Sequence, residues 1–186
     1  MSTERLEKAY ASTMRVLGNV TKEELAAATP CRSWDVRSLI NHTVGTPFFF
    51  AVAAETGVGP TDDPETDFAD ADFNASFAEG TQLATKAFGA IADDKVIKLP
   101  FGELPAAAVV NIAAVDSFVH GWDLAKATGQ STDLDPALAV ELLGIAKVSI
   151  PDQFRGSEPA PFGPIVDVPA SAPAADQLAG FLGRTP

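Results

Sequence analysis

The residues best suited to chemistry are a carboxylate and an imidazole four positions apart, in Asp116-Ser-Phe-Val-His120-Gly-Trp-Asp123. On a helix this spacing places both side chains on one face, about one turn apart, where they can hold two corners of a divalent metal ion. The chain has just two histidines, and the other is His42. If the helices that carry the two histidines pack together, two imidazole nitrogens and one carboxylate oxygen form a metal site.

Three nitrogen and oxygen ligands with one open position are typical of catalytic zinc sites. Imidazoles suit Zn, Ni, Co or Fe(II), whereas Ca²⁺ and Mg²⁺ require more oxygen ligands. Such a metal acts as a Lewis acid on a substrate oxygen, or lowers the pKa of a bound thiol or water. The plainer alternative is a hydrogen-bonded Asp–His pair beside an ordinary core histidine. The HExxH pattern of zinc proteases does not occur in the sequence.

Several neighbours of these residues have more than one interpretation. Asp123 shares the broad face of His120 and is a fourth ligand, an acceptor that fixes an imidazole tautomer, or the partner of an arginine; we favour the last two roles together. Trp122 and Trp34 are interpreted first as packing residues. Cys31, the lone cysteine, is either a small structural residue or a thiol near the site.

Two long helices are predicted to position these side chains. An apolar stripe predicts a helix over 35–55 that carries His42, with Ser33 as its N-cap. Pro47 removes one hydrogen bond of that helix, so we expect either a kink that opens space beside a ligand or a neutral packing feature. The principal helix opens near Pro105 and runs to residue 128, with Gly129 as a left-handed C-terminal cap.

The rest of the chain also reads as mostly helical. Helices are predicted over 3–17, from the capping box at 21–24, over 71–91, from residue 135 and over 174–182, with an extended piece at 95–101. Six of the fourteen prolines fall within 150–173, which predicts an extended strap over the helices. We therefore expect an all-α fold in one domain, 1–186, with four main helices, the strap at 150–173 and a terminal short helix at 174–183.

Composition limits the partners. The 186 residues carry a net charge of −12 and include no basic cluster, which argues against nucleic acid or an anionic membrane surface as a partner. The polar first residues contain no apolar signal-peptide core, and the apolar runs are too short to cross a membrane. A cytoplasmic protein is expected.

Two stretches resemble a known family. Thr29-Pro-Cys-Arg-Ser-Trp34-Asp-Val-Arg-Ser-Leu-Ile-Asn-His42 resembles the "TPC..W.V..L..H" signature of the mycothiol-dependent maleylpyruvate isomerase metal-binding domains, which belong to the DinB-like superfamily. The segment 120–129 is similar to their "HGWDLA.ATG" signature, and the tail from Phe162 to the end is similar to that of an actinobacterial subgroup. The resemblance covers nearly the whole chain.

The resemblance implies a DinB-like four-helix bundle with up-down-down-up helices, and a divalent metal ion, most simply Zn, held by His42, Asp116 and His120. It also implies a low-molecular-weight thiol such as mycothiol as a cosubstrate. Two features differ from the isomerases, which have Glu in place of Asp116 and an additional C-terminal domain. Isomerisation of maleylpyruvate itself is therefore a weaker expectation than the metal-binding bundle.

Three hypotheses follow for function. The first is a metal-dependent S-transferase or isomerase that joins a thiol to a small electrophile, or a hydrolase if water takes the thiol's place. Arg155 and Arg184 are then candidates to bind a carboxylate, or ordinary structural residues. The second is a non-catalytic metal-binding or sensor bundle, and the third is a structural role in a homodimer.

Overall fold

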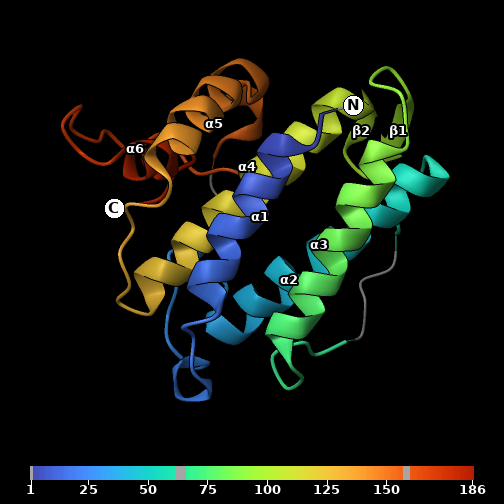
Figure 1. Ribbon diagram of the computed structural model, residues 1–186. Coiled ribbons are helices and arrows are strands. Elements are labelled where there is room, and N and C mark those ends of the chain that lie inside the picture. The colour runs from blue at the N-terminus through green and yellow to red at the C-terminus, as the bar shows by residue number, and fades with distance from the viewer. Residues whose placement is uncertain (1, 62–65, 157–159) are drawn as a thin grey trace.

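A computed structural model describes residues 2–61, 66–156 and 160–186 of the chain. Within them it contains six α-helices and one two-stranded sheet (Figure 1). The elements are α1 (Glu4–Leu17), the 3₁₀ turn η1 (Lys22–Glu24), α2 (Val36–Thr56), α3 (Phe73–Gly89), β1 (Val96–Leu99), β2 (Gly102–Pro105), α4 (Ala106–Ala127), α5 (Pro136–Ser149), the 3₁₀ turn η2 (Asp152–Phe154) and α6 (Ala174–Phe181). The expectation of a mostly helical protein is confirmed.

Helix α4 lies at the centre of the fold. It is apolar around most of its circumference, as expected for a helix that is buried on all sides, and it packs against α1, α2, α5, α6 and the hairpin. Figure 1 shows α1 alongside α4 and α2 alongside α3. Asp116 and His120 therefore belong to the element with the most neighbours, which holds their backbone rigidly.

A close approach of α1 fixes the middle of α4. A Cβ built on Gly121 would lie 2.7 Å from Thr13 Oγ1 and 3.2 Å from Thr13 Cα, so only glycine fits. Thr13 Oγ1 donates to the carbonyl oxygen of Ser117 at 2.7 Å and accepts from the Ser117 hydroxyl at 3.1 Å. Ser117 lies between Asp116 and His120 in the sequence, so its contact with Thr13 fixes how close both residues lie to α1.

Helix α2 begins at Val36, six residues before His42. Its N-cap is Asp35, whose carboxylate accepts from the backbone N–H and the hydroxyl of Ser38. The prediction of Ser33 as the cap was wrong, because the helix starts at Val36, which puts Asp35 in the N-cap position and Ser33 two residues before it. The helix continues through Pro47 to Thr56. The ring of Pro47 packs near Gly80 of α3: a Cβ built on Gly80 would lie 3.2 Å from the Cβ of Pro47.

A β-hairpin joins α3 to α4. β1 and β2 pair antiparallel, with Lys98 opposite Glu103 and Ile97 opposite Leu104. Ile97 and Leu99 are buried, which anchors β1 on the core. The all-α expectation holds in the coarser form of a mostly helical protein, to which this small hairpin is added. Only the first strand had been predicted as extended, because the second contains a Gly and a Pro and shows no strand pattern.

The C-terminal segment packs at the opposite side of the molecule from the hairpin (Figure 1). α6 lies against α5 and α4, and the Trp122 indole N–H donates to Asp176 Oδ1 at 2.7 Å. Between α5 and α6, within 150–156 and 160–173, the chain forms η2 and loop; residues 157–159 of the predicted strap lie outside the described residues. Gly180 lets this loop approach α6, since a Cβ there would lie 2.3 Å from Val168 Cγ2.

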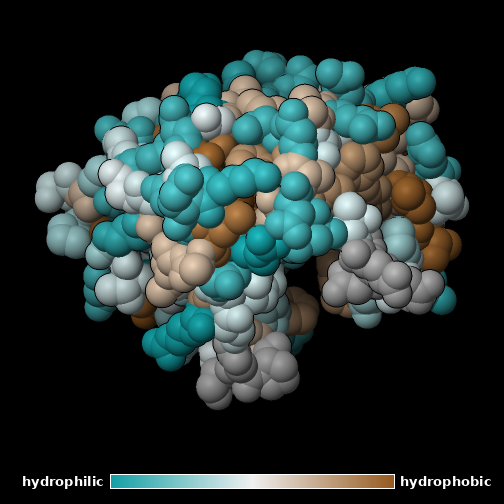
Figure 2. Space-filling model, turned by 90° about the horizontal axis from the view of Figure 1, so that it is seen from below, coloured by the Kyte–Doolittle hydropathy of each residue, from teal (hydrophilic) through white to brown (hydrophobic). Residues whose placement is uncertain are grey.

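The face shown in Figure 2 is mostly hydrophilic, and its brown side chains gather mainly on the side where the hairpin and the end of α2 lie. Exposed apolar residues of that region include Val58, Val96 and Phe101. None of the helices in the described parts of the chain combines the length and the hydrophobicity that crossing a membrane requires.

Candidate metal centre

The two histidines and Asp116 meet between α2 and α4. Asp116 Oδ1 lies 3.5 Å from His42 Nε2 and 3.4 Å from His120 Nε2, and the two imidazole centroids are 4.7 Å apart in an edge-to-face arrangement. One ligand atom from each of the three residues lies within 4.8 Å of the others. The sequence had predicted this juxtaposition, and the geometry could hold a metal ion.

The second carboxylate oxygen of Asp116 indicates whether these residues suit a cation. This oxygen, Oδ2, is shielded from solvent and has no hydrogen-bond donor among the described residues. A buried carboxylate oxygen without a partner is costly unless a cation or proton satisfies it. Two imidazoles and a carboxylate are also the donor types that a zinc-like ion prefers, so the residues fit such an ion.

The charges of the three groups reinforce one another. Burial alone would raise the pKa of Asp116, but electrostatic interaction and hydrogen bonding with the His120 and His42 rings outweigh it and hold that pKa well below its ordinary value. Burial would lower the pKa of His120, yet the Asp116 carboxylate, with further hydrogen bonds, holds it well above the ordinary value. In the metal-free protein, the proton held on His120 therefore balances the Asp116 charge in part, as a metal ion would.

Behind His120 lies a second, fully buried carboxylate. Asp123 Oδ2 accepts from His120 Nδ1 at 3.1 Å, from Arg184 Nη2 at 3.0 Å and from the Cys31 thiol at 3.2 Å, and Asp123 Oδ1 accepts from Arg184 Nε at 3.2 Å. Burial would raise the pKa of Asp123, but Arg184 and His120 outweigh it and lower the pKa. Both roles favoured for Asp123, tautomer acceptor and arginine partner, are present in the contacts.

The loop before α2 brings two more side chains to the site. Thr29 Oγ1 donates to the carbonyl oxygens of Cys31 and Trp34 and accepts from the Cys31 N–H, which fixes this loop. The Trp34 ring lies 4.7 Å from that of His42 and 5.8 Å from that of His120. Interpreting Trp34 as a packing residue missed this contact; its place eight residues before His42 was the available signal.

Arg155 lies elsewhere. Its Nη1 donates to the carbonyl oxygen of Phe181 at 2.6 Å, and its guanidinium stacks 4.3 Å from the centre of the Phe181 ring. Its described hydrogen bonds, ion pair and ring contact include none to a histidine or to Asp116. Among the described residues Arg155 therefore braces the C-terminal segment, whereas Arg184 reaches the site.

The fold and this site define a helical protein with a candidate His–His–carboxylate metal centre. Residues 6–125 match the sequence model of the mycothiol maleylpyruvate isomerase N-terminal domain. The chain therefore belongs to that family.

Two relatives, both from Mycobacterium tuberculosis, span the whole chain. They are the uncharacterized proteins MT0763 of strain CDC 1551 / Oshkosh and Rv0738 of strain H37Rv, each 38% identical over 185 residues, which covers 100% of this chain and 97% of theirs. Among solved structures, the crystal structure of the mycothiol-dependent maleylpyruvate isomerase is similar with a TM-score of 0.59 and 17% identity, over 80% of this chain and 70% of that one. At this identity the likeness concerns the fold.

Proposed function

We propose that this protein is a divalent-metal-dependent enzyme that uses a low-molecular-weight thiol such as mycothiol to isomerise, or transfer sulfur to, a small electrophile. The observation that carries the proposal is the convergence of His42, Asp116 and His120 in a chain of this family. We also propose that α1–α4 form the DinB-like four-helix bundle, up-down-down-up, within one domain spanning 1–186.

In this proposal His42 Nε2, His120 Nε2 and an Asp116 oxygen hold the ion, and Zn²⁺ is the first candidate. The ion, when bound, lowers the pKa of a thiol ligand so that thiolate is available near neutral pH. Asp116 contributes a shielded oxygen that lacks a donor among the described residues. Its shorter arm, compared with Glu, reaches the two imidazoles directly at the distances given above.

Trp34 and Asp123 contact the imidazoles and fix their orientation. The Trp34 ring contacts His42 at 4.7 Å and His120 at 5.8 Å between ring centres, and so limits how the two imidazoles can turn. Asp123 is an acceptor alone when ionised, so the contact at 3.1 Å makes His120 Nδ1 the donor and leaves Nε2 to face Asp116. The electrophile would then approach from the side of His42, whose side chain is 32% exposed, against 9% for His120.

Metal analysis tests the proposal. The untagged protein is expected to purify with about one equivalent of divalent metal, because the three ligands form one site. His42→Ala and His120→Ala should each lose it. Glu141→Gln, which changes an exposed carboxylate that pairs with Arg5, should keep the metal and so controls for nonspecific binding to an acidic surface. Equal metal content in all four proteins would refute the proposed site.

A second measurement separates an enzyme from a binding protein. Mycothiol and a set of small α,β-unsaturated carboxylates are incubated with the metal-loaded protein, and isomer or thioether formation is followed. Turnover that depends on both metal and thiol supports the enzyme. Metal binding without turnover for any substrate in the set would favour the sensor interpretation instead.

A further inference from the structure

The guanidinium of Arg184 makes four contacts inside the protein. Nε and Nη2 bind the two oxygens of Asp123, Nη1 donates to the carbonyl oxygen of Leu182 at 3.1 Å, and Nη2 also lies 3.7 Å from the Cys31 sulfur. The side chain is 12% exposed. These four contacts use four of the five guanidinium N–H groups, so no free pair of N–H groups is left to bind both oxygens of a substrate carboxylate.

Arg184 binds both oxygens of Asp123, and this bidentate contact orients the carboxylate. A fork-to-fork pair fixes the plane of the carboxylate as well as its position. Asp123 Oδ2 is thereby aimed at His120 Nδ1, and the Cys31 thiol bonds to the same oxygen. The orientation of the His120 ring thus follows from Arg184, 64 positions later in the chain.

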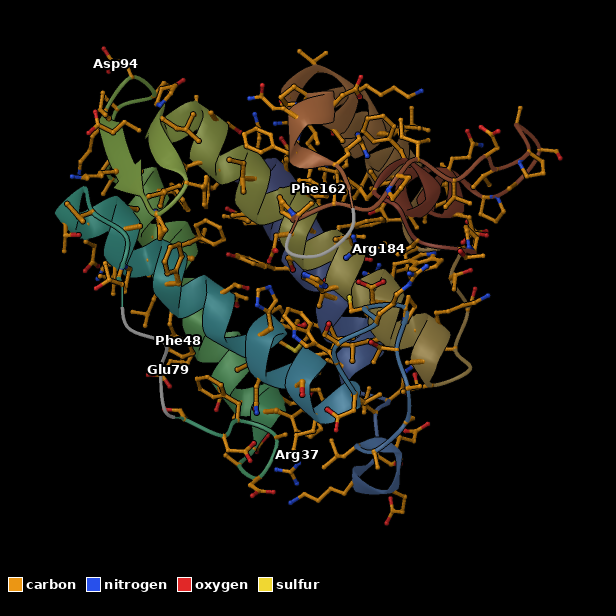
Figure 3. The ribbon with its side chains drawn as sticks, turned by 180° about the vertical axis from the view of Figure 1, so that it is seen from behind. Arg37, Phe48, Glu79, Asp94, Phe162 and Arg184 are labelled. Carbon is orange, nitrogen blue, oxygen red and sulfur yellow. The ribbon has the colours of Figure 1, made fainter. Side chains whose placement is uncertain are left out.

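We propose that Arg184 is a positioning residue: acting through Asp123, it fixes the Nδ1–H form of His120 and turns Nε2 toward the ion site. The inference rests on the proposed function for the identity of the ion. In Figure 3 Arg184 lies beside the α4 ribbon, and it is carried there by the segment that follows α6.

The Arg184–Asp123 pair also determines which of two possible sites is open to a cation. Cys31, His120 and Asp123 also have ligand atoms within 4.8 Å of one another and could hold an ion themselves. The Arg184 guanidinium, 3.0 Å from Asp123 Oδ2, already supplies that carboxylate with a positive charge and repels a second cation. His120 is therefore free to present Nε2 to the other site, with His42 and Asp116.

This role lies beyond the part of the chain that matches the family. The matched segment ends at residue 125, whereas Arg184 comes from the C-terminal end. The segment is held by Asp176, which accepts from the Trp122 indole, and by the backbone bond from Arg184 N to the carbonyl oxygen of Ala179. The C-terminal segment thus becomes part of the metal centre.

Zn²⁺ affinity of the full chain, measured by competition with a chromophoric chelator, tests the role. Arg184→Gln is expected to weaken binding roughly 10- to 100-fold, as found when partners behind a ligating histidine are removed. Asp123→Asn should cost a similar factor. The double variant should lose little more than either single variant, since both act along one path. Arg184→Lys keeps the charge without the fork and should restore only part of the affinity.

Asp176→Ala is the matched control, because it removes a bond that docks α6 but does not touch Asp123. Its Zn²⁺ affinity should equal that of the wild type. If Asp176→Ala weakens binding as much as Arg184→Gln, Arg184 acts by docking the segment and the inference is wrong. If Arg184→Gln binds Zn²⁺ as the wild type does, the inference is also wrong, while the proposed function stands.

The Nδ1 proton provides a readout that does not require metal. Since the chain has two histidines, NMR of protein labelled with ¹⁵N-histidine shows two ring systems. His120 should show a slowly exchanging Nδ1 proton with and without Zn²⁺, and Arg184→Gln should lose it in both states. A Zn²⁺-free protein with an unchanged Nδ1 signal in Arg184→Gln would overturn the inference. Absence of Zn²⁺ binding in the wild type would refute the proposed function separately.

Discussion

His120 is the residue on which most interactions of the site converge. Its Nε2 faces Asp116 and its Nδ1 faces Asp123, so the ring lies between two buried or partly buried carboxylates. Of these contacts, the sequence could predict those made within one helix, because helical spacing alone brings Asp116, His120 and Asp123 together. The pairing with His42 was predicted from there being one other histidine. The sequence predicted an arginine partner for Asp123 and offered both Arg155 and Arg184 as candidate site residues, but it could not choose between them, since no periodicity links residue 184 to α4.

Metal binding should release a proton at neutral pH. The pKa of His120 is held well above its ordinary value, so the metal-free ring is protonated at pH 7, and an ion at Nε2 must displace that proton. Affinity should therefore fall as the pH is lowered and rise until the pH passes that pKa. Calorimetry in two buffers of different ionisation enthalpy should show release of about one proton per Zn²⁺.

His120→Ala is the control for proton release, because it should give no binding heat at all. An affinity for Zn²⁺ that does not change between pH 6 and pH 8, about the range in which histidine usually titrates, would contradict the expected competition between proton and metal.

At the level of elements, the position of α4 depends on one glycine as well as on its apolar side chains. Helical periodicity predicted α1, α2, α3 and α4 close to their observed bounds, since these segments carry long and regular apolar patterns. It did not predict that Gly121 allows α1 to touch α4, because a lone glycine in a helix looks the same in a sequence whether its surroundings are crowded or open. The strand β2 was missed for a similar reason: its pairing depends on β1 and not on its own composition.

Gly121→Ala and Gly144→Ala should change stability in opposite directions. The new methyl group at residue 121 would meet Thr13 at 2.7 Å, whereas nothing lies within 4 Å of a Cβ at residue 144 of α5. Overpacking should cost Gly121→Ala about 1–3 kcal/mol, and Gly144→Ala should gain about 0.4–1 kcal/mol through lower unfolded-state entropy. Urea denaturation measures both.

Because residue 121 follows His120 directly, Gly121→Ala should also weaken Zn²⁺ binding, while Gly144→Ala should not. A Gly121→Ala protein with wild-type stability would show that α1 moves aside without cost, and that the Thr13 contact does not set the depth of α4.

At the scale of the whole molecule, an ion between α2 and α4 would add coordination bonds to the contact that His42 Nε2 already makes with Asp116 Oδ1 across these helices at 3.5 Å. A ligand that binds the folded state stabilises it by mass action. For the wild type at a free Zn²⁺ concentration about 1,000 times the Kd, the expected gain is roughly 4 kcal/mol, or a rise in Tm on the order of 10 °C.

Thermal denaturation with Zn²⁺ or with a chelator measures that gain. His42→Ala should show the same Tm in both conditions. A rise in the Tm of His42→Ala as large as that of the wild type would place the stabilising ion elsewhere on this acidic chain, whose net charge is −12.

The separation of the ligands along the chain has a mechanical consequence. His42 and Asp116 are 74 positions apart, so an ion shared between them closes a loop whose fully stretched length is about 250 Å. When the two termini are pulled apart with optical tweezers, the loaded protein should lengthen in two steps, and the second, after the coordination bonds rupture, should release that hidden length. With chelator present, the same extension should appear at once and at lower force.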